Sequence, residues 1–216
     1  MNKWFEVDTV GLRKLIEEKG PVAAIIELIQ NAWDQDVTRV DVTVELLPGR
    51  AAARVIVEDD DPKGFADPTH MYTVFAESSK KGNPDQRGRF NLGEKIALAL
   101  CYSASISTTT GTHEFDADGD RHWRKKAREV GSCFEGIIRM TREQYEPVAR
   151  AIMALLPPRG ILTTFNGRRI PGRTALREFR AALPTEVADA EGVLRKTTRQ
   201  TTIRVYAAAG EKGSLY

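Results

Sequence analysis

The sequence predicts an α+β fold, a two-layer α/β sandwich in which helices cover one face of a mixed, mostly antiparallel sheet. The first observation is that apolar and polar residues alternate in RVDVTVELL (39–47) and in AAARVIVED (51–59). Alternation with a period of two is typical of half-buried strands, and Pro48-Gly49 between the two segments predicts an antiparallel hairpin. The second observation is that helical and strand-like segments do not alternate regularly, as the βαβ units of a parallel sheet would require.

The other elements are predicted from periodicity and from the turn residues between segments. Pro157-Pro158 marks the expected boundary between a first domain, 1–157, and a strand-rich second segment, 158–216. The expected helices are 10–19, 21–35, 93–101, 142–156 and a stretch near 174–182, and the expected further strands are 103–111, 112–118, 133–140, 160–167 and 193–209.

Composition places the chain among globular proteins, with 41% hydrophobic and 29% charged residues in 216. No apolar run approaches the roughly 20 residues of a membrane helix, and the N-terminus lacks the layout of a signal peptide, so we expect a cytoplasmic protein without a membrane partner.

Charge is distributed unevenly along the chain. Residues 158–216 hold 11 Lys or Arg against 5 Asp or Glu, a net charge of +6, whereas residues 1–157 carry −4. This basic segment is compatible with a nucleic-acid or acidic protein partner, and equally with the solvated faces of a sheet and a helix.

The segment ELIQNAWD places a narrow polar stripe on an otherwise apolar helix. Glu27, Asn31 and Asp34 are spaced i, i+4 and i+7, so they project in nearly the same direction. An ordinary amphipathic surface helix is one interpretation of this stripe. An acid, an amide and an acid would also suit a metal-phosphate site.

The segment VIVEDDDPKGF ends a strand in three consecutive carboxylates, Asp59, Asp60 and Asp61, followed by a turn at Gly64. One interpretation is a solvated acidic turn. The alternative is that a carboxylate at the strand end accepts a hydrogen bond from the exocyclic amine of a nucleotide base.

The segment KKGNPDQRGRFNLGEK joins a glycine-punctuated polar loop to the start of an apolar helix. The free N–H groups and the dipole of a helix N-terminus favour a phosphate, and Ser78, Lys80 and Lys95 add hydroxyl and cationic donors. The pattern is not a P-loop, because Gly-Lys-Ser/Thr and a parallel βαβ unit are both missing. A lid that closes over a polyphosphate would have this composition.

These three segments, in this order, resemble the Bergerat-fold ATPase superfamily, which includes DNA gyrase, the ninety-kilodalton heat-shock chaperone, histidine kinases and MutL. ELIQNAWD resembles the N-box, VEDDDPKGF a loosened DxGxG box, and RGRFNLGEK the second glycine box. Gly131-Ser132 is a weaker fourth match. The resemblance covers roughly residues 5–170 and implies ATP and Mg²⁺ as cofactors.

The resemblance also implies roles for individual residues. Glu27 would be the general base that activates water, Asn31 would hold Mg²⁺, and Ser132 would support the adenine through water. The implied set for nucleotide binding is Asn31, Asp34, Asp59, Asp60, Gly64, Ser78, Lys80, Gly88, Arg89, Phe90, Asn91, Leu92, Gly93, Lys95 and Ser132.

The sequence departs from the family pattern at the aspartate turn, which reads Asp61-Pro62-Lys63-Gly64 and lacks the first glycine of DxGxG. Counting from the strand makes Asp59 the adenine ligand, and counting back from Gly64 makes it Asp60. Strand alternation is the firmer guide and favours Asp59.

The expected function is Mg²⁺-dependent ATP binding and hydrolysis, acting as a switch in a larger protein that dimerises with ATP and is associated with nucleic acid. Residues 158–216 would begin a truncated, transducer-like domain. One alternative is a module that senses ATP with little turnover, and another is a nucleic-acid-binding α+β domain that does not use ATP.

Overall fold

A computed structural model describes residues 20–64, 93–188 and 194–207 of the chain. The helices are α2 (Gly20–Trp33), α3 (Gly93–Leu100) and α4 (Arg142–Met153). The strands are β1 (Arg39–Leu46), β2 (Ala52–Asp59), β3 (Cys101–Ser107), β4 (Thr112–Phe115), β5 (Arg121–Arg124), β6 (Cys133–Arg139), β7 (Leu162–Phe165), β8 (Arg168–Arg169), β9 (Arg177–Ala188) and β10 (Leu194–Val205).

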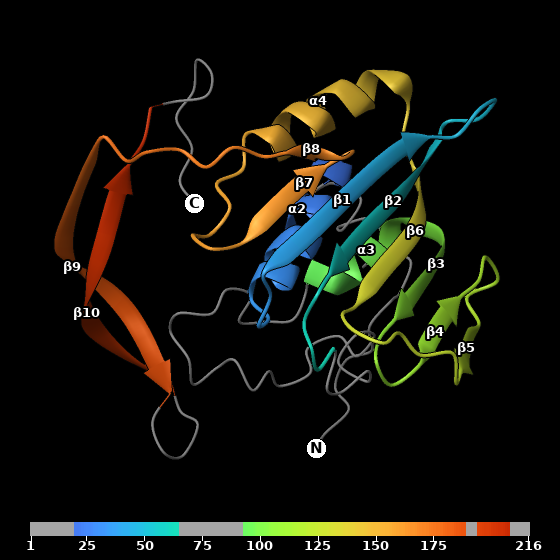
Figure 1. The fold of residues 1–216 in the computed structure, drawn as a ribbon, viewed down its shortest axis with the longest axis horizontal. Helices are drawn as coiled ribbons and strands as arrows, with labels where there is room; N and C mark the ends of the chain where they lie inside the picture. Colours follow the sequence, from blue (N-terminus) through green and yellow to red (C-terminus); the bar gives the residue numbers. More distant parts are fainter. Residues whose placement is uncertain (1–19, 65–92, 189–193, 208–216) are drawn as a thin grey trace, which may run out of the picture.

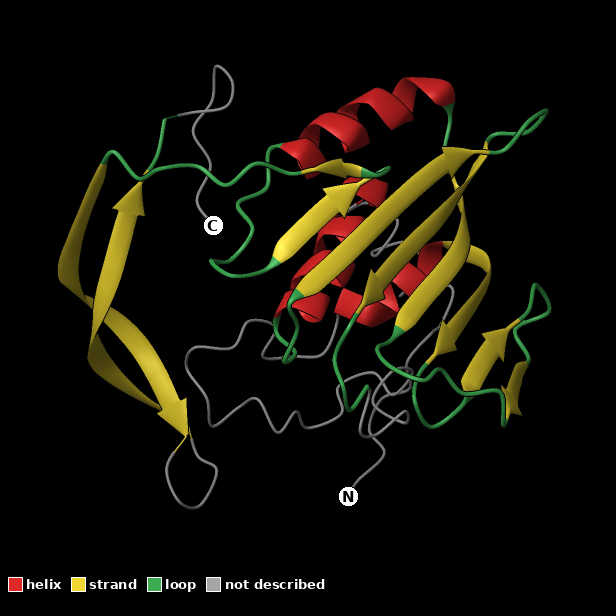
Figure 2. Ribbon diagram, viewed as in Figure 1, coloured by secondary structure: helices red, strands yellow, loops and turns green. Residues whose placement is uncertain are grey.

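Eight of these strands form one sheet in the order β5-β4-β3-β6-β2-β1-β7-β8. Every neighbouring pair is antiparallel except β1 and β7, so the sheet is mixed and mostly antiparallel, as predicted. The helices form a second layer, in which α2 contacts α3 and α4 as well as β1 and β2 (Figures 1 and 2). This architecture confirms the predicted two-layer α/β sandwich.

The core lies between the layers because the alternating strands turn one row of side chains toward the helices. Val40, Val42 and Val44 of β1 are buried, and their partners Asp59, Val57 and Val55 on β2 share that face. From the helix layer, Ile25 and Ile29 pack into the same core. None of the described helices is long and apolar enough to cross a membrane.

One sequence prediction is contradicted by the observed elements, one observed strand was not predicted, and one predicted helix is untested. The helix expected near 174–182 is wrong, because this segment forms the first half of β9, paired over its whole length with β10. β5 was not predicted, since it is short, exposed and without alternation. The helix expected at 10–19 lies outside the described residues.

The main sheet continues past Pro157-Pro158, where the sequence places the domain boundary. β7 pairs in parallel with β1, and Thr163 and Phe165 are buried. The indole N–H of Trp33 in α2 donates to the hydroxyl of Thr163 over 3.0 Å. The sandwich of sheet and helices therefore extends at least to Ile170, which is 2% exposed.

Candidate functional site

The polar stripe of α2 borders the apolar core. Glu27 and Asn31 are one helical turn apart, and both are half-buried. The helix ends at Trp33, so Asp34 follows it, and the N–H of Asp34 donates to the carbonyl oxygen of Gln30 (3.1 Å). A fully solvated stripe would be exposed, so this partly buried set is compatible with a binding role.

Asp59 is the last residue of β2 and is only 9% exposed. Its Oδ1 accepts hydrogen bonds from the backbone N–H groups of Asp61 (3.1 Å) and Ser132 (3.0 Å). Within the described part of the chain, no group donates to its Oδ2. The fold therefore fixes one oxygen of this carboxylate and leaves the other available as an acceptor.

Burial raises the pKa of Asp59, because the charged form loses hydration. The two N–H groups that donate to Oδ1 lower this pKa in part, while the neighbouring carboxylates of Asp61 and Asp60 raise it further. A carboxylate kept at a free-energy cost, with an unused acceptor atom, is typical of a functional position.

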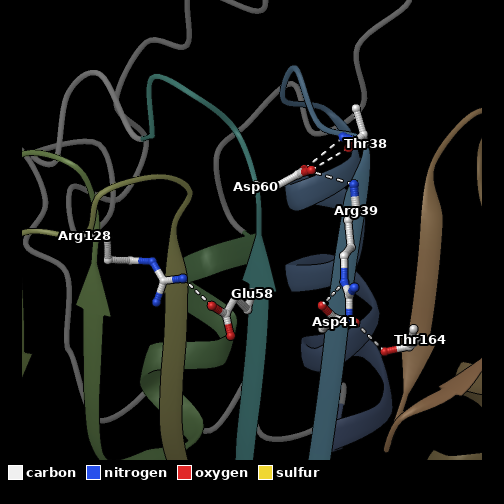
Figure 3. Close-up of polar contacts among 7 residues, drawn as sticks. All are labelled: Thr38, Arg39, Asp41, Glu58, Asp60, Arg128 and Thr164. Atoms are coloured by element: carbon white, nitrogen blue, oxygen red, sulfur yellow. Dashed lines mark hydrogen bonds and ion pairs between the residues drawn. The ribbon is translucent and has the colours of Figure 1, made fainter.

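Asp60 points toward Thr38 and Arg39 at the start of β1 and has a different environment from Asp59 (Figure 3). Its Oδ1 accepts from the backbone N–H groups of Thr38 (2.8 Å) and Arg39 (2.9 Å), and its Oδ2 accepts from the Thr38 hydroxyl. Burial raises the pKa of Asp60, but these hydrogen bonds outweigh burial and lower the pKa overall. Asp60 therefore ties the end of β2 to the start of β1.

Gly131 and Ser132, which directly precede β6, lie against Asp59. Gly131 has a φ of 77°, and a Cβ built on it would lie 1.9 Å from the carbonyl oxygen of Asp59, so only glycine fits. Ser132 is 4% exposed, and its carbonyl oxygen accepts from the backbone N–H of Asp59 (2.9 Å) while its own N–H donates to the Oδ1 of Asp59 (3.0 Å). This close approach holds Asp59 in place.

The unusual aspartate turn is ordered around Asp61. The buried carboxylate of Asp61 accepts from the N–H of Lys63 (2.9 Å), and its carbonyl oxygen accepts from the N–H groups of Gly64 (3.1 Å) and Gly131 (3.0 Å). Gly64 has a φ of 60° and lies against Thr109, where a Cβ would be 2.8 Å from the hydroxyl oxygen. The turn thus forms a defined structure without the first glycine of the family pattern.

Arg128 anchors the segment that leads into Gly131. Its guanidinium pairs with Glu58 on β2, and its Nε donates to the carbonyl oxygen of Val130 (3.2 Å) (Figure 3). Its backbone N–H donates to the carbonyl oxygen of Thr108 (2.8 Å). The ion pair connects the residue before Asp59 to the segment before Ser132.

The topology brings the end of β2 to the C-terminal end of α2. Residues 34–38 connect α2 to β1, and the register pairs Asp59 with Val40 at the start of β1. Asn31 and Asp34 lie at that end of α2, and Glu27 lies one turn earlier. Asp59 at the strand end and the C-terminal part of the polar stripe, Asn31 and Asp34, therefore lie at one end of the molecule.

Most of the predicted lid lies outside the described residues. Ser78, Lys80, Gly88, Arg89, Phe90, Asn91 and Leu92 lie outside the described residues, whereas Gly93 is the first residue of α3 and Lys95 belongs to the same helix.

No group of three or more His, Cys, Asp or Glu side chains suited to a metal ion occurs in the described ranges. The half-buried carboxylate of Glu27 and amide of Asn31 are oxygen donors of the kind that Mg²⁺ prefers, and Mg²⁺ typically takes its other ligands from phosphates and water. The donors present therefore fit Mg²⁺ bound together with a nucleotide.

Sequence reasoning missed Arg128 and the structural role of Asp61. Arg128 lies in an exposed run of cations, so no pattern separates it from its neighbours. The burial of Asp61 follows from its contact with Gly131, which lies 70 positions further along the chain.

No protein-family model matches the chain, and no curated protein matches its sequence. Solved structures do match in fold. The ATPase region of Saccharomyces cerevisiae topoisomerase II bound to ICRF-187 (dexrazoxane) aligns with a TM-score of 0.51 and 11% identity, and the same region in a second structure with 0.50 and 12%. The N-terminal domain of a DNA repair protein aligns with 0.50 and 14%.

The aligned part is 69% of this chain for the two topoisomerase II structures and 81% for the DNA repair protein. The chain spans 48% of the length of the first two and 64% of the third. At identities of 11–14%, the likeness to these structures shows a shared fold.

Proposed function

We propose that this chain binds ATP with Mg²⁺ and hydrolyses it, as a switch module of a dimerising protein. The observation that carries the proposal is Asp59, a buried carboxylate at a strand end with one oxygen held by two N–H groups and one acceptor atom left unused by the described residues. The fold shared with ATPase regions supports it.

In this proposal Asp59 recognises adenine. A carboxylate oxygen accepts a hydrogen bond from the exocyclic amine of adenine, whereas guanine presents a carbonyl oxygen at that position and would be repelled. Ser132 lies beside Asp59, and its hydroxyl makes no hydrogen bond with any described residue, so it remains free to hold a water against the base.

Glu27 is the proposed general base and Asn31 the proposed Mg²⁺ ligand. When bound, Mg²⁺ would neutralise developing charge on the phosphates. Glu27 would orient the attacking water and accept its proton, a contribution worth about 10²–10⁴ in rate. The lid residues 78–95 would wrap the phosphates, and ATP would favour a homodimer.

The first experiment is a calorimetric titration of the chain with a non-hydrolysable ATP analogue and Mg²⁺, with the matching GTP analogue as control. We expect saturable binding of the adenine analogue and none of the guanine analogue. Equal binding of both analogues would contradict the role of Asp59, and binding of neither would contradict the nucleotide site in this chain.

The Glu27→Gln variant separates hydrolysis from binding without changing the shape of the side chain. We expect unchanged affinity for the ATP analogue and a turnover rate lower by about 10²–10⁴. The competing function, an ATP sensor without turnover, is favoured by the altered turn at Asp61–Gly64. It predicts the same negligible rate for the original chain and for the variant.

A further inference from the structure

The turn between β7 and β8 consists of Asn166 and Gly167 and lies at the edge of the main sheet, beside β1 (Figure 1). Asn166 has a φ of 47° and Gly167 a φ of 75°, and Phe165 pairs with Arg168 on either side of them. Two consecutive positive φ values are typical of a type I′ hairpin turn, for which Asn-Gly is a preferred sequence. Both turn residues are exposed to solvent.

The side chain of Asn166 continues the pairing of β7 with β1 past the last residue of the strand. The backbone N–H of Asn166 donates to the carbonyl oxygen of Val42 (2.8 Å). Its Oδ1 accepts from the N–H of Val44 (2.9 Å), and its Nδ2 donates to the carbonyl oxygen of Val44 (3.2 Å). The side-chain amide therefore acts as an additional peptide group in the ladder along β1.

The same amide also reaches the helix layer. Its Nδ2 donates to the hydroxyl oxygen of Tyr145 in the first turn of α4 (3.1 Å), and Tyr145 packs against the core. Three hydrogen bonds therefore hold this side chain between β1 and α4, and both polar atoms of the amide are engaged.

Asn-Gly is also the sequence in which asparagine is chemically least stable, because glycine has no side chain to hinder attack by its own backbone nitrogen. Of the asparagines in the chain, Asn166 alone precedes a glycine. Asparagine is among the thermolabile residues of proteins. The sequence and the exposure of the turn therefore favour a reaction that the three hydrogen bonds oppose.

We propose that Asn166 is a deamidation site whose reaction is gated by opening of the turn between β7 and β8. The nitrogen of Gly167 loses its proton to hydroxide and attacks Cγ of Asn166. The new N–Cγ bond closes a succinimide ring, the Cγ–Nδ2 bond breaks, and Nδ2 leaves as ammonia after taking a proton from water. Water then opens the ring to aspartate or isoaspartate, so that water is consumed and ammonia is released.

The folded turn opposes this attack for a geometric reason. Cγ must turn toward the nitrogen of Gly167, whereas the amide that carries Cγ is bound to Val44 and Tyr145. The side chain gives up these hydrogen bonds before the ring can close, so the reaction proceeds from an open form of the turn. Its rate should then follow the population of that open form.

The product does not restore the original contacts. An aspartate oxygen in the place of Nδ2 cannot donate to the carbonyl oxygen of Val44, so two acceptors would face each other. The hydroxyl of Tyr145 can still donate to the new carboxylate. An isoaspartate also inserts an additional carbon atom into the main chain of a turn that is paired on both sides. Deamidation is therefore an irreversible switch that loosens this edge of the main sheet.

The test is peptide mapping by mass spectrometry of the full 216-residue chain after incubation at mildly alkaline pH. The original chain is compared in its folded form and unfolded in urea, together with the folded variant Y145F. The matched control is Y102F, which removes a hydroxyl from an exposed tyrosine of β3 that does not contact Asn166. Thermal melting verifies that both variants are folded.

We expect rapid deamidation of Asn166 in the unfolded chain, and a rate more than about tenfold lower in the folded chain. Y145F should react about 2- to 10-fold faster than the folded original chain, as expected for the loss of one of the three hydrogen bonds. Y102F should react at the original rate. In urea, the original chain and Y145F should react equally, because the variant changes the gate and not the chemistry.

The variant N166D, which carries the aspartate product from the start, should melt at a lower temperature than the original chain. Equal deamidation rates in the folded and unfolded chains, equal rates in folded Y145F and the original chain, or unchanged melting of N166D would each overturn the proposal. The inference does not rest on the proposed nucleotide site.

Discussion

Adjacent carboxylates at the end of β2 have opposite tasks. Asp59 faces the helix layer with a raised pKa, and Asp60 caps the start of β1 with a lowered pKa. Because a strand turns successive side chains to opposite faces, one position separates the group that we propose to bind a ligand from a group used by the fold. Substitutions at the two positions should therefore affect different quantities.

Asp59→Asn should weaken adenine binding and reduce its selectivity over guanine while keeping the fold. The amide oxygen can still accept from Asp61 and Ser132, but the amide NH₂ would face the amine of adenine, donor against donor. Loss of a charge-assisted hydrogen bond of about 1.5–3 kcal/mol corresponds to roughly 10- to 150-fold weaker binding. Calorimetry with the ATP analogue measures this, and unchanged affinity would contradict the role of Asp59.

The matched control is Asp60→Ala. It removes the acceptor for the N–H groups of Thr38 and Arg39, so it should lower the free energy of unfolding by about 1 kcal/mol and leave the affinity for the ATP analogue nearly unchanged. If the effects on binding were reversed, Asp60 would be the base ligand.

The raised pKa of Asp59 also predicts a pH dependence of stability. Ionisation of Asp59 is less favourable in the folded chain than in the unfolded chain, where its pKa is near 3.8, so the cost is absent at low pH. The cost appears as the pH rises from 3.8 through the folded-state pKa. Asp59→Asn should therefore gain stability relative to the original chain over that window, as measured by thermal melting from pH 4 to pH 7.

At the level of elements, the pair of Arg128 and Glu58 is inferred to hold the segment before Ser132 against β2. We predict that Arg128→Ala weakens binding of the ATP analogue several-fold, because Gly131 and Ser132 lose an anchor. Glu58→Ala should have the same effect, and the double variant should be no worse than either single one. Additive losses would show that the two residues act independently.

The control pair is Arg54 and Glu135, joined at 2.8 Å between β2 and β6. Its side chains are 41% and 39% exposed, against 28% and 43% for Arg128 and Glu58, and it is not connected to Ser132. Partly exposed ion pairs contribute about 0.2–1 kcal/mol to stability, so both pairs should affect melting alike, and only the first should affect nucleotide affinity.

Sequence reasoning correctly predicts the elements in which the alternation of apolar and polar residues continues over several positions. β1 and β2 alternate over eight residues each, and the hairpin follows from that alternation. The segment 177–182 (REFRAA) consists largely of good helix formers, yet pairing with β10 makes it a strand. Asp59 was identified at the end of a regular strand, whereas Arg128 depends on a contact across 70 positions that no local pattern records.

At the level of the whole molecule, the main sheet continues past Pro157-Pro158 through β7 and β8, and we therefore propose that the first domain ends after β8. β7 is the parallel neighbour of β1, Phe165 and Ile170 are buried, and Trp33 donates to Thr163. Each buried large apolar side chain contributes about 1.5–3 kcal/mol to the free energy of unfolding. Removal of this strand would therefore cancel most of the 5–15 kcal/mol by which a typical domain is stable.

Two truncations test this assignment. A chain of residues 1–172 retains β7 and β8 and loses the ribbon of β9 and β10, so it should unfold cooperatively and bind the ATP analogue as the full chain does. A chain of residues 1–157 lacks β7, and we expect no cooperative thermal transition by circular dichroism. Cooperative folding of 1–157 with full nucleotide affinity would restore the boundary at Pro157. Loss of folding in 1–172 would mean that the ribbon, anchored through Arg173 to the end of α4, is an integral part of the first domain.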